Sequence, residues 1–175
     1  MKPSWAILLD LDETLVRTKA IEAYRKKRDW SRIHQHFDQT ELPMHTLKFL
    51  ERIRPHVSLG VVTSSPRSYA ERLLAYHQLS VPVLAAYHDT PGKHKPEPDP
   101  LLFAANRLCL SPSQCFHIGN DVNDIVAAYR ANMIPILLSW NGLPEGVQLV
   151  PGSTFCANWQ EVLSYLKSRI EESRR

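Results

Sequence analysis

Residues 5–14 read Trp-Ala-Ile-Leu-Leu-Asp-Leu-Asp-Glu-Thr, an apolar run that leads directly into two carboxylates one residue apart. A short apolar run that ends in a polar turn is typical of a buried β-strand. Ligands of an open parallel sheet bind at the carboxyl ends of its strands, so Asp10 and Asp12 would lie where a site is expected. A cation would relieve their mutual repulsion. An acidic helix cap or an exposed turn would explain the same two residues without any site.

Similar apolar runs recur between helical patterns along the rest of the chain. We expect strands at residues 5–9, 57–62, 115–118 and 134–138, with a fifth candidate at 81–87. The spacing predicts helices at residues 44–54, 68–78, 100–110 and 122–132, and a last helix from Asn158 to about residue 172. Strands that alternate with helices indicate an α/β fold, a three-layer Rossmann-like parallel sheet with helices on both faces. We expect one domain over residues 1–175.

Apolar side chains predict the buried faces of two of these helices. In residues 44–54 the stripe consists of Leu47, Leu50 and Ile53, and in residues 68–78 it consists of Ala70, Leu73 and Leu74 together with His77. Residues 140–154 have clustered Gly and Pro and are predicted to form a loop.

The cysteines and the chain start indicate a reducing compartment. Cys109, Cys115 and Cys156 are odd in number and lack metal-ligand spacing, so we expect buried, reduced thiols. The first residues do not resemble a signal peptide, and no apolar stretch has the length of a membrane span. These features predict a cytoplasmic protein without membrane contact. The sequence makes no prediction of its oligomeric state.

Residues 17–43 are the only segment that fits no strand and helix unit. They hold seven of the 21 Lys and Arg residues but four of the 18 acids, which leaves equal numbers of both charges elsewhere. We expect a short basic helical insertion beside the carboxyl edge of the sheet.

Three further predicted strand ends carry groups suited to a phosphate and its metal. Thr63, Ser64 and Ser65 offer hydroxyl and backbone N–H groups at a helix start, unless they only cap that helix. Lys95 precedes a proline and would neutralise phosphate charge, although such a pair also occurs in solvated loops. A last polar turn follows residues 115–118, and its acids would also serve as caps. It contains Asn120, Asp121 and Asp124.

This ordered set resembles the four motifs of the haloacid-dehalogenase-like hydrolase superfamily, in its phosphoglycolate-phosphatase-like branch. The matching stretches are Asp-Leu-Asp-Glu-Thr from Asp10, Thr-Ser from Thr63, Lys-Pro-Glu-Pro from Lys95, and Gly-Asn-Asp-x-x-Asp from Gly119. The resemblance covers residues 5 to about 140. It implies a Rossmann-like sheet, a mobile flap after the first strand and a Mg²⁺-dependent phosphatase. Residues 17–43 would then be a minimal cap.

The resemblance also implies a role for each matching residue. Asp10 would attack phosphorus and become an aspartyl phosphate. Asp12 would protonate the leaving oxygen and then activate water, while its main-chain carbonyl binds Mg²⁺. Thr63 or Ser64, with Lys95, would hold the phosphoryl oxygens. Thr14 would brace the loop. Lys95 is preferred over Lys93 because the family lysine directly precedes the proline.

The metal ligands of the last motif stay open, because Asn120 stands where many relatives have aspartate. An amide oxygen is an uncharged and weaker ligand, so Asp121 would bind the metal directly, with Asp124 as a ligand or close by and Asn120 near them. The order of these roles could be reversed. A degenerate site with weak metal binding is the other alternative.

Function follows from the same residues. Within the superfamily that the sequence resembles, members that dehalogenate or cleave phosphonates lack an acid two positions after the nucleophile, so the resemblance implies phosphoryl transfer. Mutases of that superfamily keep both acids but generally need a larger cap. We expect a phosphomonoesterase for a small phosphorylated metabolite or nucleotide. The alternatives are a macromolecular phosphate, such as a nucleic-acid end or phosphoprotein, and a non-catalytic binding module. Basic residues of the insertion would contact the substrate or form a solvated face; they are Arg25, Lys26, Arg28 and Arg32.

Overall fold

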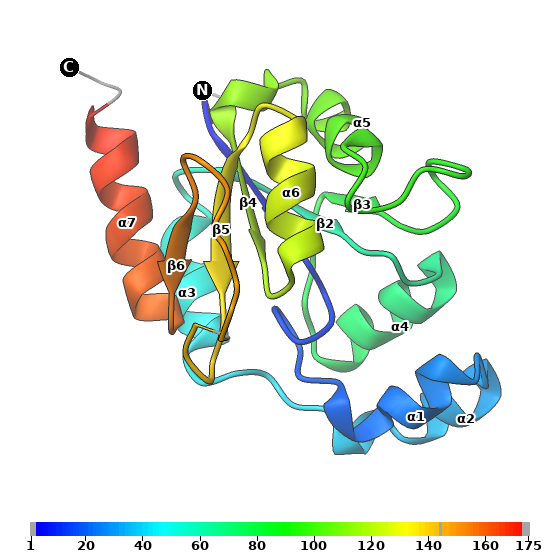
Figure 1. Ribbon diagram of the computed structural model, residues 1–175. Helices are drawn as coiled ribbons and strands as arrows, with labels where there is room; N and C mark the ends of the chain where they lie inside the picture. Colours follow the sequence, from blue (N-terminus) through cyan, green and yellow to red (C-terminus); the bar gives the residue numbers. More distant parts are fainter. Residues whose placement is uncertain (1–2, 144, 173–175) are drawn as a thin grey trace.

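A parallel sheet forms the centre of the molecule in the computed structural model, which describes residues 3–143 and 145–172 (Figure 1). Within those residues the sheet has six strands in the order β3-β2-β1-β4-β5-β6. The strands are β1 (Ala6–Leu9), β2 (Ser58–Val62), β3 (Val83–Ala85), β4 (Cys115–Gly119), β5 (Ile134–Leu138) and β6 (Thr154–Cys156). Strand β1 therefore lies inside the sheet, where its residues pair with both β2 and β4.

Helices cover both faces of this sheet, which confirms the predicted three-layer α/β fold. The main helices are α3 (Thr46–Ile53), α4 (Arg67–Tyr76), α5 (Asp99–Leu108), α6 (Val122–Arg130) and α7 (Trp159–Glu172). Ile7 and Leu9 of β1 belong to the core cluster formed with α3, α4 and α7. Ala6 and Leu8 point to the other face and belong to the cluster formed with α5 and α6. All four residues are fully buried, as expected for a strand covered on both sides.

The insertion consists of short helices at the carboxyl ends of the strands (Figure 1). They are η1 (Lys19–Ile21), α1 (Glu22–Lys26), α2 (Trp30–Gln35) and η2 (Phe37–Gln39), and a further short helix, η3 (Pro112–Gln114), precedes β4. Ile21 and Ile33 of the insertion are fully buried in the core. The ring of Phe37 packs edge-on against Tyr69 of α4, with centroids 5.9 Å apart. These contacts place the insertion against α4, next to the carboxyl edge of the sheet.

The predicted loop at 140–154 is confirmed for its described residues up to 153, after which β6 begins. No strand was predicted at β6, which is too short to show a periodic pattern and forms by pairing with β5. Two predictions about single residues are wrong. Leu50 and Ile53 are buried as predicted, but Leu47 is exposed, because α3 turns Phe49 toward the core in its place. Cys109 is exposed, because it adopts a left-handed conformation just after the last turn of α5.

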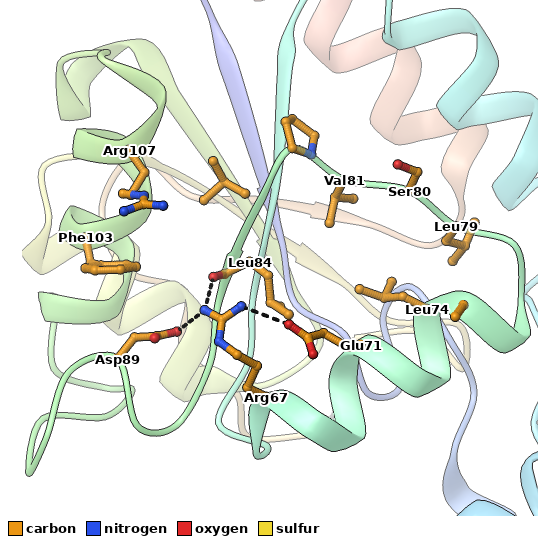
Figure 2. A pocket seen from close by; sticks show the side chains of 13 residues that line it. Arg67, Glu71, Leu74, Leu79, Ser80, Val81, Leu84, Asp89, Phe103 and Arg107 are labelled. Atoms are coloured by element: carbon orange, nitrogen blue, oxygen red, sulfur yellow. Dashed lines mark hydrogen bonds and ion pairs between the residues drawn. The ribbon is translucent and has the colours of Figure 1, made fainter.

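The outer edge of the sheet is formed by β3 and carries a cavity of about 520 Å³ between α4 and α5 (Figure 2). Arg67 spans this edge, where its guanidinium donates to the carbonyl oxygen of Leu84 at 2.9 Å and to Asp89 at 2.7 Å. A third hydrogen bond of Arg67 reaches Glu71 at 3.3 Å. Arg67 therefore hydrogen-bonds a carbonyl oxygen of β3 with which a further strand, added at this edge, would have to pair.

No helix in the described part of the chain combines the length and apolarity that a bilayer crossing requires.

Candidate active site

The turn after β1 brings Asp10 and Asp12 to one cavity. The N–H groups of Leu15 and Val16 both donate to the carbonyl oxygen of Leu11 at 3.0 Å, which closes the turn. Glu13 adopts a left-handed conformation with φ of 62°. This closed turn holds both acids at the carboxyl edge of the sheet.

The cavity at this edge has a volume of about 320 Å³ and is lined by residues from all four motifs. Its lining consists of Asp10, Asp12, Glu13, Arg25, Thr63, Ser64, Ser65, Lys95, Asn120, Asp121, Asn123 and Asp124. The structure therefore brings together the predicted residues of the four strand ends, with Arg25 from the insertion. The larger cavity at β3 contains none of them.

Lys95 lies at the floor of this cavity between two carboxylates. Its Nζ atom is 2.7 Å from Asp10 Oδ1 and 2.6 Å from Asp124 Oδ1, and it also donates to the carbonyl oxygen of Val62 at 3.2 Å. Lys93, the other candidate lysine, instead pairs with Asp99 at the surface. The cavity thus holds one buried cation beside its buried acids.

Burial and charge shift the pKa values of these three groups in different directions. Burial raises the pKa of Asp10 to about 7, against the opposing effect of Lys95. Burial would also raise the pKa of Asp124, but the charge of Lys95 and a hydrogen bond from His117 outweigh it and hold that pKa below its usual range. For Lys95, burial is outweighed by the charges of Asp10 and Asp124, so its pKa is raised. Lys95 therefore remains charged, and of its two acid partners Asp10 is protonated more easily than Asp124.

Gly119 and His117 of β4 hold Asp124 in place. A Cβ atom at residue 119 would overlap the Asp124 carboxyl group, so only glycine leaves room for it. His117 Nδ1 lies 3.0 Å from the carbonyl oxygen of Leu8, and its Nε2 lies 3.3 Å from Asp124 Oδ1. Burial lowers the pKa of His117.

Both oxygens of the Asp12 carboxylate already have donors. Tyr69 OH donates to Oδ1 at 2.7 Å, and Ser65 Oγ donates to Oδ2 at 2.9 Å. Arg25 Nη2 also lies 2.9 Å from Oδ2. Burial and the charge of Asp12 raise the pKa of Tyr69, so the phenol stays protonated as a donor.

The hydroxyl groups after β2 do not cap α4, which begins at Arg67 after Pro66 and not at Ser64 or Ser65. Thr63 is buried, and its Oγ1 accepts a hydrogen bond from the backbone N–H of Ser65 at 3.0 Å. Ser64 is exposed and lines the cavity. Thr63 and Ser64 therefore lie where a bound oxyanion would meet hydroxyl groups.

The polar turn after β4 divides its side chains between the cavity and α6. Thr14 Oγ1 lies 3.2 Å from Asn120 Oδ1 and 3.3 Å from Asp10 Oδ2, so Asn120 and Asp10 flank the same hydroxyl. Asp121 accepts from the backbone N–H of Asn123 at 2.7 Å and thus caps α6. Asp124 is turned inward to Lys95.

These oxygen donors suit Mg²⁺, which prefers carboxylate, carbonyl and amide oxygens. In the part of the chain that the structure describes, no three His, Cys, Asp or Glu side chains are close enough to hold a metal alone. The cavity does offer the Asp10 carboxylate, the Asn120 amide oxygen next to it and the Asp121 carboxylate. A site here would combine a few carboxylates with neutral oxygens.

The four basic candidates of the insertion lie in different places. Arg25 lines the cavity, and Arg28 lines an adjoining one of about 280 Å³. Lys26 pairs with Glu22 at 2.8 Å, and Arg32 pairs with Asp29 at 3.4 Å on the surface. Tyr69 and His117 also contact the site, although neither was predicted to have a role in it. Nothing in their local sequence sets them apart from core residues, because their contacts join distant segments.

Acids after β1 and β4, with a buried lysine between them at the carboxyl edge of the sheet, define a Rossmann-like hydrolase fold. The chain belongs to the haloacid dehalogenase-like hydrolase family, whose model matches residues 19–137. It is 33% identical over 107 residues to a phosphoglycolate phosphatase from Xylella fastidiosa, which covers 59% of this chain and 44% of that protein. It is 32% identical over 112 residues to a putative pyrophosphatase from Caldanaerobacter subterraneus, which covers 62% of this chain and 50% of that protein.

A solved structure shows the same fold over nearly the whole chain. It is a phosphatase of this family from Thermococcus onnurineus, with a TM-score of 0.79 at 20% identity, covering 93% of this chain and 97% of that one. The chain spans half or less of the length of the two curated relatives above.

Proposed function

We propose that the protein is a Mg²⁺-dependent phosphomonoesterase that forms an aspartyl phosphate on Asp10 and acts on a small phosphorylated metabolite or nucleotide. The observation that carries this proposal is the shared cavity in which Asp10, only 7% exposed, faces Lys95 and the hydroxyl groups of Thr63 and Ser64. Relatives named as phosphoglycolate phosphatase and pyrophosphatase support a small substrate.

In the first step, an Asp10 carboxylate oxygen attacks phosphorus and the bond to the leaving oxygen breaks. Asp12, in its protonated form, gives its proton to that leaving oxygen. In the second step, Asp12 as carboxylate takes a proton from water, the water oxygen attacks phosphorus, and Asp10 is released with inorganic phosphate. Each proton that Asp12 gives is thus recovered within one cycle.

The other residues of the cavity hold the phosphoryl group. Lys95 offers its charge to the phosphoryl oxygens, and Thr63 and Ser64 offer hydroxyl donors. Mg²⁺, when bound, would mask the negative charge that otherwise keeps a carboxylate and a phosphate apart. The Asp10 carboxylate, the Asp12 main-chain carbonyl, Asn120 and Asp121 would hold it, with Asp124 fixed to Lys95 beside them.

The test is hydrolysis of phosphoglycolate and of p-nitrophenyl phosphate with and without added Mg²⁺. We expect turnover that requires Mg²⁺ and disappears in Asp10→Asn, while Glu51→Gln, an exposed acid on α3, keeps it. A phosphoenzyme trapped with labelled substrate should be cleaved by hydroxylamine, as acyl phosphates are. Full activity of Asp10→Asn would refute the proposal.

A further inference from the structure

Arg25 connects the insertion to the carboxylate proposed as acid and base. Its Nη2 atom lies 2.9 Å from Asp12 Oδ2 and 3.4 Å from Ser65 Oγ, and its Nη1 donates to Thr18 Oγ1 at 3.1 Å. The guanidinium carbon lies 5.7 Å from the centre of the Tyr69 ring. One buried donor, Nε, has no hydrogen-bond partner. Arg25 therefore lies beside the catalytic cavity with one hydrogen-bond donor left without a partner.

This contact restrains Asp12 in the free protein. The Arg25 guanidinium is 2.9 Å from the carboxylate proposed to serve the leaving oxygen, so Arg25 itself lies beside the place of the leaving group. Tyr69 and Ser65 donate to the same carboxylate. Arg25 could therefore move from Asp12 to a bound anion while Asp12 kept its two neutral donors.

A cationic cavity of about 280 Å³ adjoins Arg25 and the phosphate-binding hydroxyl groups. It is lined by Arg25, Arg28, Trp30, Ser64, Ser65, Pro66, Tyr87 and His88, and thus by no acid. It shares Arg25, Ser64 and Ser65 with the catalytic cavity. The leaving group of a phosphate ester bound in the catalytic cavity would therefore extend directly into this second cavity. Its cations and aromatic rings favour an anionic occupant over a neutral or cationic one.

Another cavity lined by Arg25 has no excess of positive charge. It has a volume of about 290 Å³ and contains Glu13 and Glu22 beside Lys19 and Arg25. Its two acids offset its two cations, so it attracts an anionic leaving group less strongly. The direction toward Arg28 and Trp30 is therefore the favoured one.

We propose that Arg25 is a specificity-determining residue that binds a second anionic group, carboxylate or phosphate, on the leaving group of the substrate. To bind that anion, Arg25 would exchange its contact with Asp12 for a contact with the leaving group. The proposal rests on the proposed function. The substrates in the names of the two curated relatives, phosphoglycolate and pyrophosphate, both carry such a second anion.

The experiment compares phosphoglycolate with phosphoglycolamide, which keeps the phosphate but has a neutral amide of similar shape in place of the carboxylate. We expect the native protein to prefer phosphoglycolate by about 10-fold or more in kcat/KM, the range of one charge-assisted contact. Arg25→Gln should lose this preference, with a lower kcat/KM for phosphoglycolate and a nearly unchanged kcat/KM for phosphoglycolamide. Arg25→Lys should restore part of it. Arg32→Gln, a surface cation of the same insertion, should keep the native ratio.

The ratio of the kcat/KM values for the two substrates, measured on one preparation, does not depend on the fraction of folded protein. An unchanged ratio in Arg25→Gln, or an equal loss for both substrates, would overturn the role of Arg25 and leave the proposed function intact. Absence of Mg²⁺-dependent turnover of every ester by the native protein would overturn both proposals.

Discussion

Lys95 Nζ lies 2.7 Å from Asp10 Oδ1, and 85 residues of chain separate the two groups. Both side chains are almost completely buried, so neither charge is compensated by water. A buried lysine that approaches a nucleophilic acid so closely has to leave or share that contact when a phosphate arrives. The pair therefore links the stability of the fold to the chemistry proposed for it.

Replacement of Lys95 by methionine should destabilise the protein strongly. It would leave Asp10 and Asp124 buried beside each other without a cation, and loss of one partner of a buried pair costs about 3–5 kcal/mol. Urea unfolding of Lys95→Met measures the change. Lys93→Met removes only a surface pair and should shift the midpoint little. Similar midpoints for both variants would contradict the prediction.

Replacement of Gly119 by alanine should impair both stability and activity. The new Cβ would push the Asp124 carboxyl group away from Lys95, and overpacking of this kind costs about 1–3 kcal/mol. Gly92→Ala is the matched control, since φ is +74° there and no atom lies within 4 Å. Backbone strain should lower the free energy of unfolding of Gly92→Ala by about 1 kcal/mol, while its phosphatase activity stays unchanged. Thermal unfolding and kcat, measured for both variants, distinguish a loss of stability alone from a loss of stability and activity. Normal turnover in Gly119→Ala would disprove the steric argument.

Acidification should weaken the contact between the insertion and α4. Thr40 Oγ1 donates to the carbonyl oxygen of Phe37, so His77 Nε2, 2.7 Å away, must be the donor to Thr40. Burial lowers the pKa of His77 below its ordinary value of 6.5. The unfolded chain therefore binds more protons than the folded one just below pH 6.5, and stability falls as pH falls through that window.

His77→Gln keeps a donor for Thr40 but cannot titrate. The urea midpoint of this variant should change less between pH 7.5 and pH 5.5 than that of the native protein. If both curves had the same slope, His77 would contribute nothing to the acid sensitivity.

Thiol reactivity should distinguish one cysteine from the other two. Cys109 is exposed, whereas Cys115 and Cys156 are buried, and burial raises the pKa of both to about 11. Titration of the folded protein with Ellman's reagent should detect about one thiol, and about three after denaturation. Cys109→Ser should react only when unfolded. Rapid reaction of this variant in its folded state would show that a buried thiol is accessible.

The amino-acid sequence alone determined the class of fold and the positions of the acids. Short apolar runs that alternate with helical patterns require a covered parallel sheet, and acids that follow those runs must gather at one edge of it. Both features are local patterns, so they can be read without knowing any distant contact. The same reasoning failed for β6, Leu47 and Cys109, because pairing with β5 and the orientation of α3 and α5 are tertiary properties.

Only the tertiary structure decided which side chains meet. Tyr69 reaches Asp12 across 57 residues, and Lys95 reaches Asp124 across 29. The charge composition identified the insertion as basic. It could not distinguish Arg25, which lies in the cavity, from Arg32, which lies on the surface. The physical reason is that a side chain's partners depend on strand order and helix orientation, which the packing of the whole core determines.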